Sequence, residues 1–158
     1  MTQPDLVGNE RDVLIHYMNK MRNAVVRTSE GVDDERARRP GVPSGTNLLG
    51  TVQHLTVVEA HWFRFVFLGE DFERDYSMEV PRGVTRAELV AAYRAECARS
   101  DDIVRACPDL STRAARENPG EDERISLRRI CAHMIEEIAR HAGQCDILRE
   151  QIDGVTDD

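Results

Sequence analysis

The chain has 158 residues, of which 41% are hydrophobic and 32% are charged, so its length and composition predict one globular domain over residues 1–158. Its 29 acidic residues outnumber its 21 basic ones and give a formal net charge of -8, and no run rich in lysine and arginine stands out, which argues against nucleic acid as a partner. The first residues do not show a basic stretch followed by an apolar one, and no apolar run reaches the roughly 18 residues that a membrane span needs, so we expect a cytoplasmic protein without a membrane partner.

Local patterns predict four long helices, of which the first covers residues 10–30 and ends at Gly31. Apolar side chains recur on one face of this helix, and that predicted buried face consists of Leu14, Tyr17, Met21, Val25 and Thr28. A polar segment follows at residues 33–39. The prolines and glycines of residues 40–45 then predict a loop.

The second helix is expected from residues 44–46 to Gly69 and is the most apolar of the four. Its predicted buried face consists of Leu48, Val52, Leu55, Val58, Trp62 and Phe65. Four aromatic residues gather near its end, and we interpret them as core packing rather than as a substrate wall or a dimer face; they are Trp62, Phe63, Phe65 and Phe67.

The third and fourth helices have clear start and stop signals. Thr85 and Glu88 form the pattern of a capping box, which predicts a third helix over residues 85–107 that Pro108 ends. The fourth is expected over residues 126–152 and ends before Gly154. A long polar connection, residues 70–83, precedes the third helix. The fold class is therefore expected to be all-α, a four-helix bundle with long crossover connections.

Two polar residues interrupt the apolar stripe of the fourth helix. The stripe reads Leu127, Ile130, Met134, Glu137, His141, Cys145 and Leu148. Glu137 and His141 are therefore expected to be buried, and a buried carboxylate is costly unless it is paired or bound to a cation. A carboxylate and an imidazole four residues apart on one helix can bind the same metal ion.

A metal site needs a third ligand from another helix, and His54 on the second helix is the first candidate, with His61 as the fallback. His54, Glu137 and His141 would form a set of two histidines and one glutamate with open positions, which is typical of catalytic zinc, although nickel or non-haem iron would also accept it. His133 is a candidate support for Glu137.

Structural interpretations of the same residues stay open at this point. His54 can be a core histidine bonded to a carbonyl group, and Glu137 can form an ion pair with Arg128 or Arg140. The cysteines, Cys97, Cys107, Cys131 and Cys145, show no CxxC spacing and are predicted to be reduced thiols packed as small apolar side chains.

Two segments carry a resemblance to a known family. They are residues 44–63, which include Gln53-His54-Leu55 and Glu59-Ala-His-Trp-Phe63, and residues 133–150, which include Glu137-Ile-Ala-Arg-His141. Together they resemble the DinB-like superfamily of four-helix metal-binding proteins, in particular its actinobacterial branch related to mycothiol-dependent S-transferases and maleylpyruvate isomerases.

The resemblance implies metal ligands at His54, Glu137 and His141, a homodimer, and activation of a low-molecular-weight thiol. The expected function is a metal-dependent, zinc-type thiol S-transferase whose partners are a small-molecule thiol, such as mycothiol, and an electrophile. The alternatives are a noncatalytic metal-binding stress-response bundle and a non-haem iron enzyme.

Overall fold

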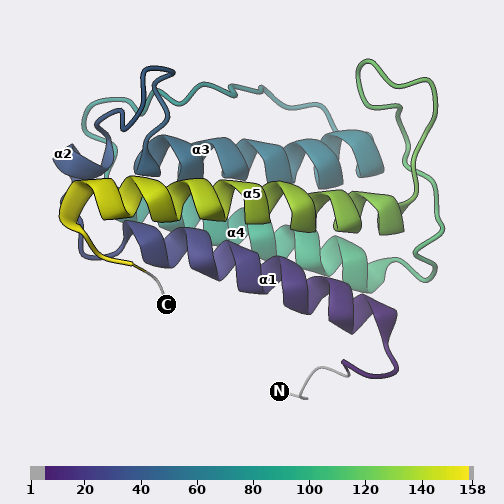
Figure 1. Ribbon diagram of the computed structural model, residues 1–158. Coiled ribbons are helices and arrows are strands. Elements are labelled where there is room, and N and C mark those ends of the chain that lie inside the picture. Colours follow the sequence, from purple (N-terminus) through teal and green to yellow (C-terminus); the bar gives the residue numbers. More distant parts are fainter. Residues whose placement is uncertain (1–5, 157–158) are drawn as a thin grey trace.

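The computed structural model describes residues 6–156, and four long helical segments form a bundle in this range (Figure 1). The helical segments are α1 (Glu10–Ser29), α2 (Asp34–Ala37), α3 (Leu48–Glu59), its direct continuation η1 (Ala60–Leu68), α4 (Arg86–Ala106) and α5 (Leu127–Asp153). The described residues contain no strand, only an isolated bridge between Arg113 and Ser126. This architecture confirms the predicted all-α four-helix bundle.

The bundle contains two pairs of parallel neighbours, α1 beside α5 and α3 beside α4 (Figure 1). Arg128 at the start of α5 pairs with Glu10 at the start of α1, and Arg149 near the end of α5 donates to the carbonyl group of Thr28 near the end of α1. Because α3 with η1 and the next helix α4 run in the same direction, the connection between them must return along the whole bundle. In Figure 1 this connection passes over α3, as the predicted crossover.

The helix ends follow the local signals of the sequence. The side chain of Thr85 accepts a hydrogen bond from the backbone N–H of Glu88, whose carboxylate accepts one from the backbone N–H of Thr85. Ser126 caps α5 at its start, and Gly69 and Gly154 end η1 and α5 with φ angles of 78° and 76°. These left-handed values favour glycine. The short helix α2 lies in the polar segment 33–39, where no helix was predicted.

The second predicted helix has the expected extent, but its last nine residues form a π-helix, η1. The wider π turn changes which side chains face the core. Phe63, Val66 and Phe67 are buried, whereas Phe65, which was predicted on the buried face, is only partly buried. Core packing is therefore confirmed for three of the four aromatic residues named above, and Phe65 is the exception.

The buried face of α1 agrees with the predicted one only in part. Val25 and Thr28 are buried as predicted, whereas Tyr17 is 47% exposed. Ile15, Met18 and Arg22 are buried although they were not predicted. Arg22 lies on this face, although an arginine is almost never buried unless it is paired. Arg22 is in fact only 3% exposed.

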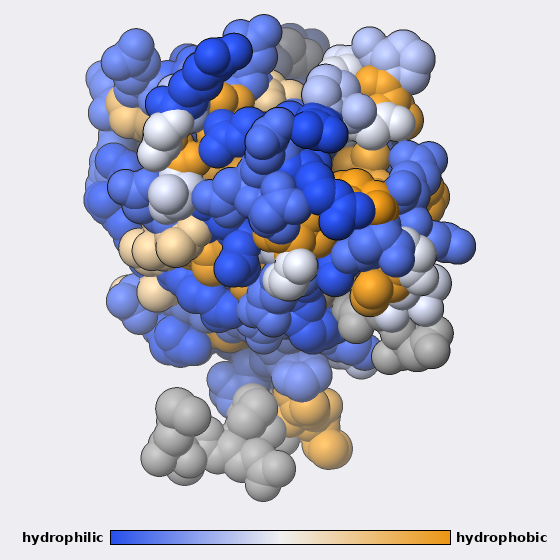
Figure 2. Space-filling model, turned by 90° about the vertical axis from the view of Figure 1, so that its left-hand side faces the viewer, coloured by the Kyte–Doolittle hydropathy of each residue, from blue (hydrophilic) through white to orange (hydrophobic). Residues whose placement is uncertain are grey.

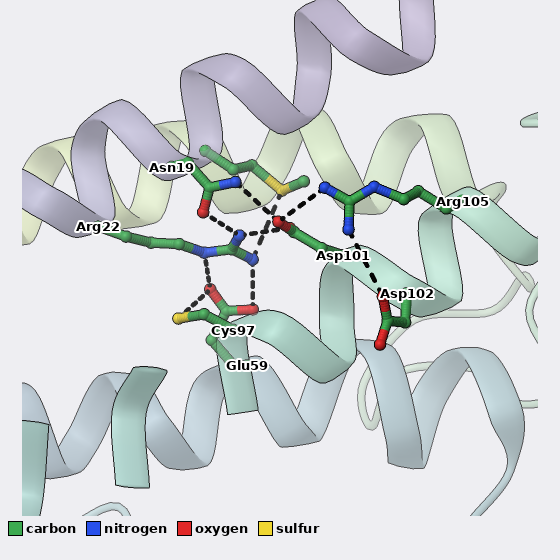
Figure 3. Close-up of polar contacts among 8 residues, drawn as sticks. Asn19, Arg22, Glu59, Cys97, Asp101, Asp102 and Arg105 are labelled. Carbon is green, nitrogen blue, oxygen red and sulfur yellow. Dashed lines mark hydrogen bonds and ion pairs between the residues drawn. The ribbon is translucent and has the colours of Figure 1, made fainter. Parts of the chain in front are cut away.

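Arg22 is buried because two carboxylates neutralise it (Figure 3). Its Nε and Nη2 atoms donate to the two carboxylate oxygens of Glu59 at 2.7 and 2.8 Å, and Nη1 donates to Asp101 at 2.7 Å. Asn19 also donates to Asp101 at 2.7 Å. The network joins α1, α3 and α4, and its Glu59 carboxylate is fully buried.

The four cysteines are free and buried, as predicted. No helix in the described range is long and apolar enough to span a membrane. Figure 2 shows the end of the bundle near α2, where hydrophilic side chains cover most of the face and apolar ones are scattered among them.

Candidate metal centre

The structure brings His54, Glu137 and His141 together between α3 and α5. One ligand atom from each residue lies within 4.8 Å of the other two. Two ligands of one zinc ion lie at most about 4.4 Å apart, because zinc bonds to imidazole nitrogen and carboxylate oxygen are about 2.0–2.2 Å long. The observed limit of 4.8 Å is close to this value, so the residues fit a divalent metal ion.

The two ligand candidates on α5 contact each other directly, with 3.1 Å between Nε2 of His141 and Oε1 of Glu137. The expected burial is right for His141, which is 9% exposed, but wrong for Glu137, whose side chain is 25% exposed. A helix turns 100° per residue, and after Met134 the core position falls on Ile138 rather than on Glu137. Glu137 consequently lies at the edge of the core, where solutes can reach it.

His54 is held in the tautomer that a metal ligand needs. Its Nδ1 atom lies 3.2 Å from the backbone carbonyl oxygen of Tyr76. A carbonyl oxygen only accepts hydrogen bonds, so Nδ1 carries the proton and Nε2 of the neutral ring keeps a free lone pair. The ring centroids of His54 and His141 lie 5.1 Å apart. Support of a histidine through its second nitrogen is common at protein metal sites.

The electrostatics favour the protonation states that bind a metal. Burial lowers the pKa of His54, and the nearby His141 lowers it further, against the raising effects of the Tyr76 carbonyl group and Glu137. The hydrogen bond from His141 lowers the pKa of Glu137 despite its partial burial. The imidazole of His54 is therefore biased toward the neutral form and the carboxylate toward the ionised form.

The alternative histidines lie outside this donor set. Nε2 of His61 lies 2.9 Å from Oδ1 of Asn118, and the fallback ligand is thus directed to another partner. The ring of His133 packs against Trp62 with centroids 4.5 Å apart, and no hydrogen bond joins it to Glu137 in the described part of the chain. Its role as a support for Glu137 stays a prediction. Arg128 was one predicted ion-pair partner of Glu137, but it pairs with Glu10 instead.

The crossover connection is attached to α3 beside this centre. The N-cap of α3 and two side chains within the helix donate to carbonyl groups of the connection: Asn47 to Met78, Gln53 to Glu79 and His54 to Tyr76. A carbonyl partner for His54 was one of the structural alternatives, and the structure shows that bond. The pattern could not identify Tyr76 as this partner, because every residue carries a backbone carbonyl group.

Two imidazoles and one carboxylate from facing helices form a donor set suited to zinc, and a zinc ion held by these three ligands would keep a coordination position open for a substrate. The sequence profile of the Mycothiol-S-transferase family matches residues 13–154, which include all three donors. The chain belongs to this family. Membership in the Mycothiol-S-transferase family points to a thiol substrate and agrees with the resemblance found in the sequence.

Solved structures share the fold of this Mycothiol-S-transferase family member. YfiT from Bacillus subtilis, described as a probable metal-dependent hydrolase with an unusual four-helix bundle topology, matches with a TM-score of 0.71 and 15% identity over 96% of this chain and 92% of YfiT. A conserved protein from Enterococcus faecalis matches with a TM-score of 0.67 and 13% identity, over 93% of this chain and 99% of that protein. At these identities the similarity establishes the fold alone. No match was found among curated proteins.

Proposed function

We propose that this protein is a metal-dependent S-transferase that activates a low-molecular-weight thiol, such as mycothiol, for attack on an electrophile. His54, Glu137 and His141 are the proposed metal ligands, and zinc is the proposed metal, with nickel and iron as alternatives. The convergence of these three side chains from two helices carries the proposal. Family membership supports the thiol as substrate.

A bound divalent cation would supply a positive centre that favours the thiolate form of a thiol at neutral pH. With two neutral imidazoles and one carboxylate as ligands, a divalent ion would leave one net positive charge at the site, which would attract an anionic sulfur. In the overall reaction the thiol proton passes to solvent, the sulfur forms a bond to the electrophilic carbon, and the leaving group departs with the bonding electrons.

The buried cysteines do not supply the nucleophile. Burial raises the pKa of Cys131 to about 12 and that of Cys145 to about 11, so both thiols stay protonated at neutral pH. A protonated, inaccessible thiol is a poor nucleophile. The proposal therefore takes the reactive sulfur from a second substrate.

Elemental analysis of untagged protein, combined with a conjugation assay, tests the proposal. We expect about one divalent metal per chain and thiol-dependent conjugation of 1-chloro-2,4-dinitrobenzene. His141→Ala should lose the metal and at least about 100-fold in rate, since loss of a mere supporting residue already costs about 10–100-fold. His16→Ala on α1, which removes a histidine outside the centre, should change neither quantity. A chelator should also lower the melting temperature, because the ligands join α3 to α5.

The same measurements separate the alternatives. A metal without conjugation by any cellular thiol would leave a noncatalytic metal-binding bundle. Metal-dependent consumption of oxygen would indicate a non-haem iron enzyme, and metal-dependent hydrolysis would match the description of YfiT. Protein without metal, and with equal rates for wild type and His141→Ala, would refute the proposal.

Two further parts of the proposal concern the protein's surroundings. A homodimer is proposed from the family resemblance, and sedimentation velocity tests it. A cytoplasmic location is proposed because free thiols, both of the four cysteines and of the cosubstrate, persist in a reducing compartment.

A further inference from the structure

We propose that Arg74, held by His61 beside the metal centre, binds an anionic group of the electrophilic substrate. The inference rests on the proposed transferase function and adds the class of electrophile: one that carries a carboxylate or a similar anion. The residues that carry it are outside the metal donor set.

A chain of hydrogen bonds fixes the position of the Arg74 guanidinium. Nδ2 of Asn118 donates to Glu121 at 3.4 Å, which leaves Oδ1 of Asn118 to accept from Nε2 of His61 at 2.9 Å. Since Nε2 of His61 carries the proton, Nδ1 has a free lone pair and accepts from Nη1 of Arg74 at 3.3 Å. His61 is only 9% exposed, so the residue that orients the guanidinium is itself rigidly packed.

The guanidinium also lies over an aromatic ring. The Cζ atom of Arg74 is 3.8 Å from the centroid of Phe65, the aromatic residue that the π-helix leaves partly exposed, and the Cζ atom of Arg116 is 4.4 Å from it. Stacking on an aromatic face restricts an arginine while leaving N–H groups at the edge of the guanidinium available. The packing therefore orients Arg74 before any ligand arrives.

Arg74 differs from its arginine neighbours in its charge balance. Arg116 pairs with Asp71 at 2.8 Å, and Arg64 pairs with Glu70 at 2.9 Å. No carboxylate in residues 6–156 forms an ion pair with Arg74, whose side chain is exposed. Asp71, which pairs with Arg116, also has its pKa lowered by Arg74, but it makes no direct ion pair with it. An oriented guanidinium without a direct carboxylate partner suits a planar anion such as a carboxylate.

Tyr76 connects this arginine to the metal centre. Its ring centroid lies 6.2 Å from that of His54 and 6.0 Å from that of His61. Burial raises the pKa of the Tyr76 hydroxyl, and the nearby Arg74 lowers it. His54 and His61 are seven residues apart on one continuous helical segment, which corresponds to about 10 Å along the axis. An electrophile reacting at the metal centre can therefore place an anionic substituent on Arg74.

The first test measures equilibrium binding rather than activity. Isothermal titration of the metal-loaded full chain compares 3,5-dinitrobenzoate with the neutral 3,5-dinitrobenzamide. We expect the benzoate to bind about tenfold or more tightly than the amide, and Arg74→Gln to abolish this preference. Arg82→Gln removes the same charge from another exposed position of the crossover connection and should retain the preference. A preference that survives in Arg74→Gln, or is missing in wild type, would overturn the inference.

The second test uses matched reactive probes. The thiol sulfur displaces chloride, which leaves with its bonding electrons, from either 4-chloro-3,5-dinitrobenzoate or 1-chloro-2,4-dinitrobenzene. We expect Arg74→Gln to raise KM for the benzoate at least about tenfold more than it raises KM for the neutral probe. Equal effects on both probes would count against Arg74 as an anion site. Selective binding of the anion without any conjugation would instead refute the transferase function alone, so the two failures are distinguishable.

Discussion

At the level of single residues, Glu137 and His141 illustrate how one helical turn separates two environments. Their four-residue spacing brings the side chains into contact, which is a local property of the helix. Their different burial depends on how α5 is rotated against its neighbours, and the exposed edge that this rotation gives Glu137 is the side from which a substrate can approach.

Metal binding should be lost in acid. The pKa of His54 is lowered from its ordinary 6.5 and that of Glu137 from its ordinary 4.5, so both favour metal binding at pH 7. As the pH falls through the histidine range, the metal-free protein binds protons that the metal-bound protein cannot, and affinity drops. We expect marked loss of metal below about pH 6 in a chelator competition between pH 8 and pH 5. Unchanged retention at pH 5 would contradict the histidine ligands.

The cysteines should be dispensable for conjugation. Cys131→Ala and Cys145→Ala remove thiols whose pKa values are raised by burial, and each should change the conjugation rate by less than about twofold while costing about 1 kcal/mol of stability. Rate measurements on folded variants test this. A large loss of rate in either variant, at normal metal content, would assign that thiol a chemical role.

At the level of elements, the crossover connection completes the part of the candidate site that lies on α3. Its backbone supplies the acceptor for His54, and its side chains supply Tyr76 and Arg74. The close approach depends on Gly50, where a Cβ atom would collide with the carbonyl oxygen of Met78. A backbone atom cannot move aside as the end of a flexible side chain can.

Gly50→Ala should therefore destabilise the protein by about 1–3 kcal/mol, as overpacking does elsewhere, and should weaken metal binding through His54. Gly143→Ala on α5 is the matched control, because nothing lies within 4 Å of the added methyl group and alanine favours the helix by about 0.5–1 kcal/mol. Urea denaturation and metal titration measure both effects. Equal stability of the two variants would show that the connection shifts without cost.

At the level of the whole molecule, the Arg22 network joins three helices through charges that lie in the core. Burial opposes the charged form of Arg22, but Glu59 and Asp101 raise its pKa overall. Removing one partner of such a network leaves the others buried without compensation.

Arg22→Met should consequently cost about 3–5 kcal/mol in denaturant unfolding. Lys20→Met, a change of charge at an exposed position of the same helix, should stay within about 0.5 kcal/mol. A similar small loss for Arg22→Met would mean that water enters the network and solvates Glu59.

The sequence by itself determined the features that depend on neighbours along the chain. The capping box at Thr85, the glycine stops at Gly69 and Gly154, and the pairing of Glu137 with His141 all act within a few residues, so the helices and one half of the candidate site could be predicted. The predicted sides of α1 and η1 were wrong where a buried arginine and a π turn overrode the apolar pattern.

Only the tertiary structure decided which distant side chains meet. His54 rather than His61 faces Glu137, Arg74 rests on His61, and Arg22 finds Glu59 and Asp101, because the height and rotation of packed helices fix these encounters. The relative height and rotation of the helices depend on the packing of the whole core. A short stretch of sequence does not determine them, since a rotation by one residue, 100° on a helix, exchanges one facing side chain for another.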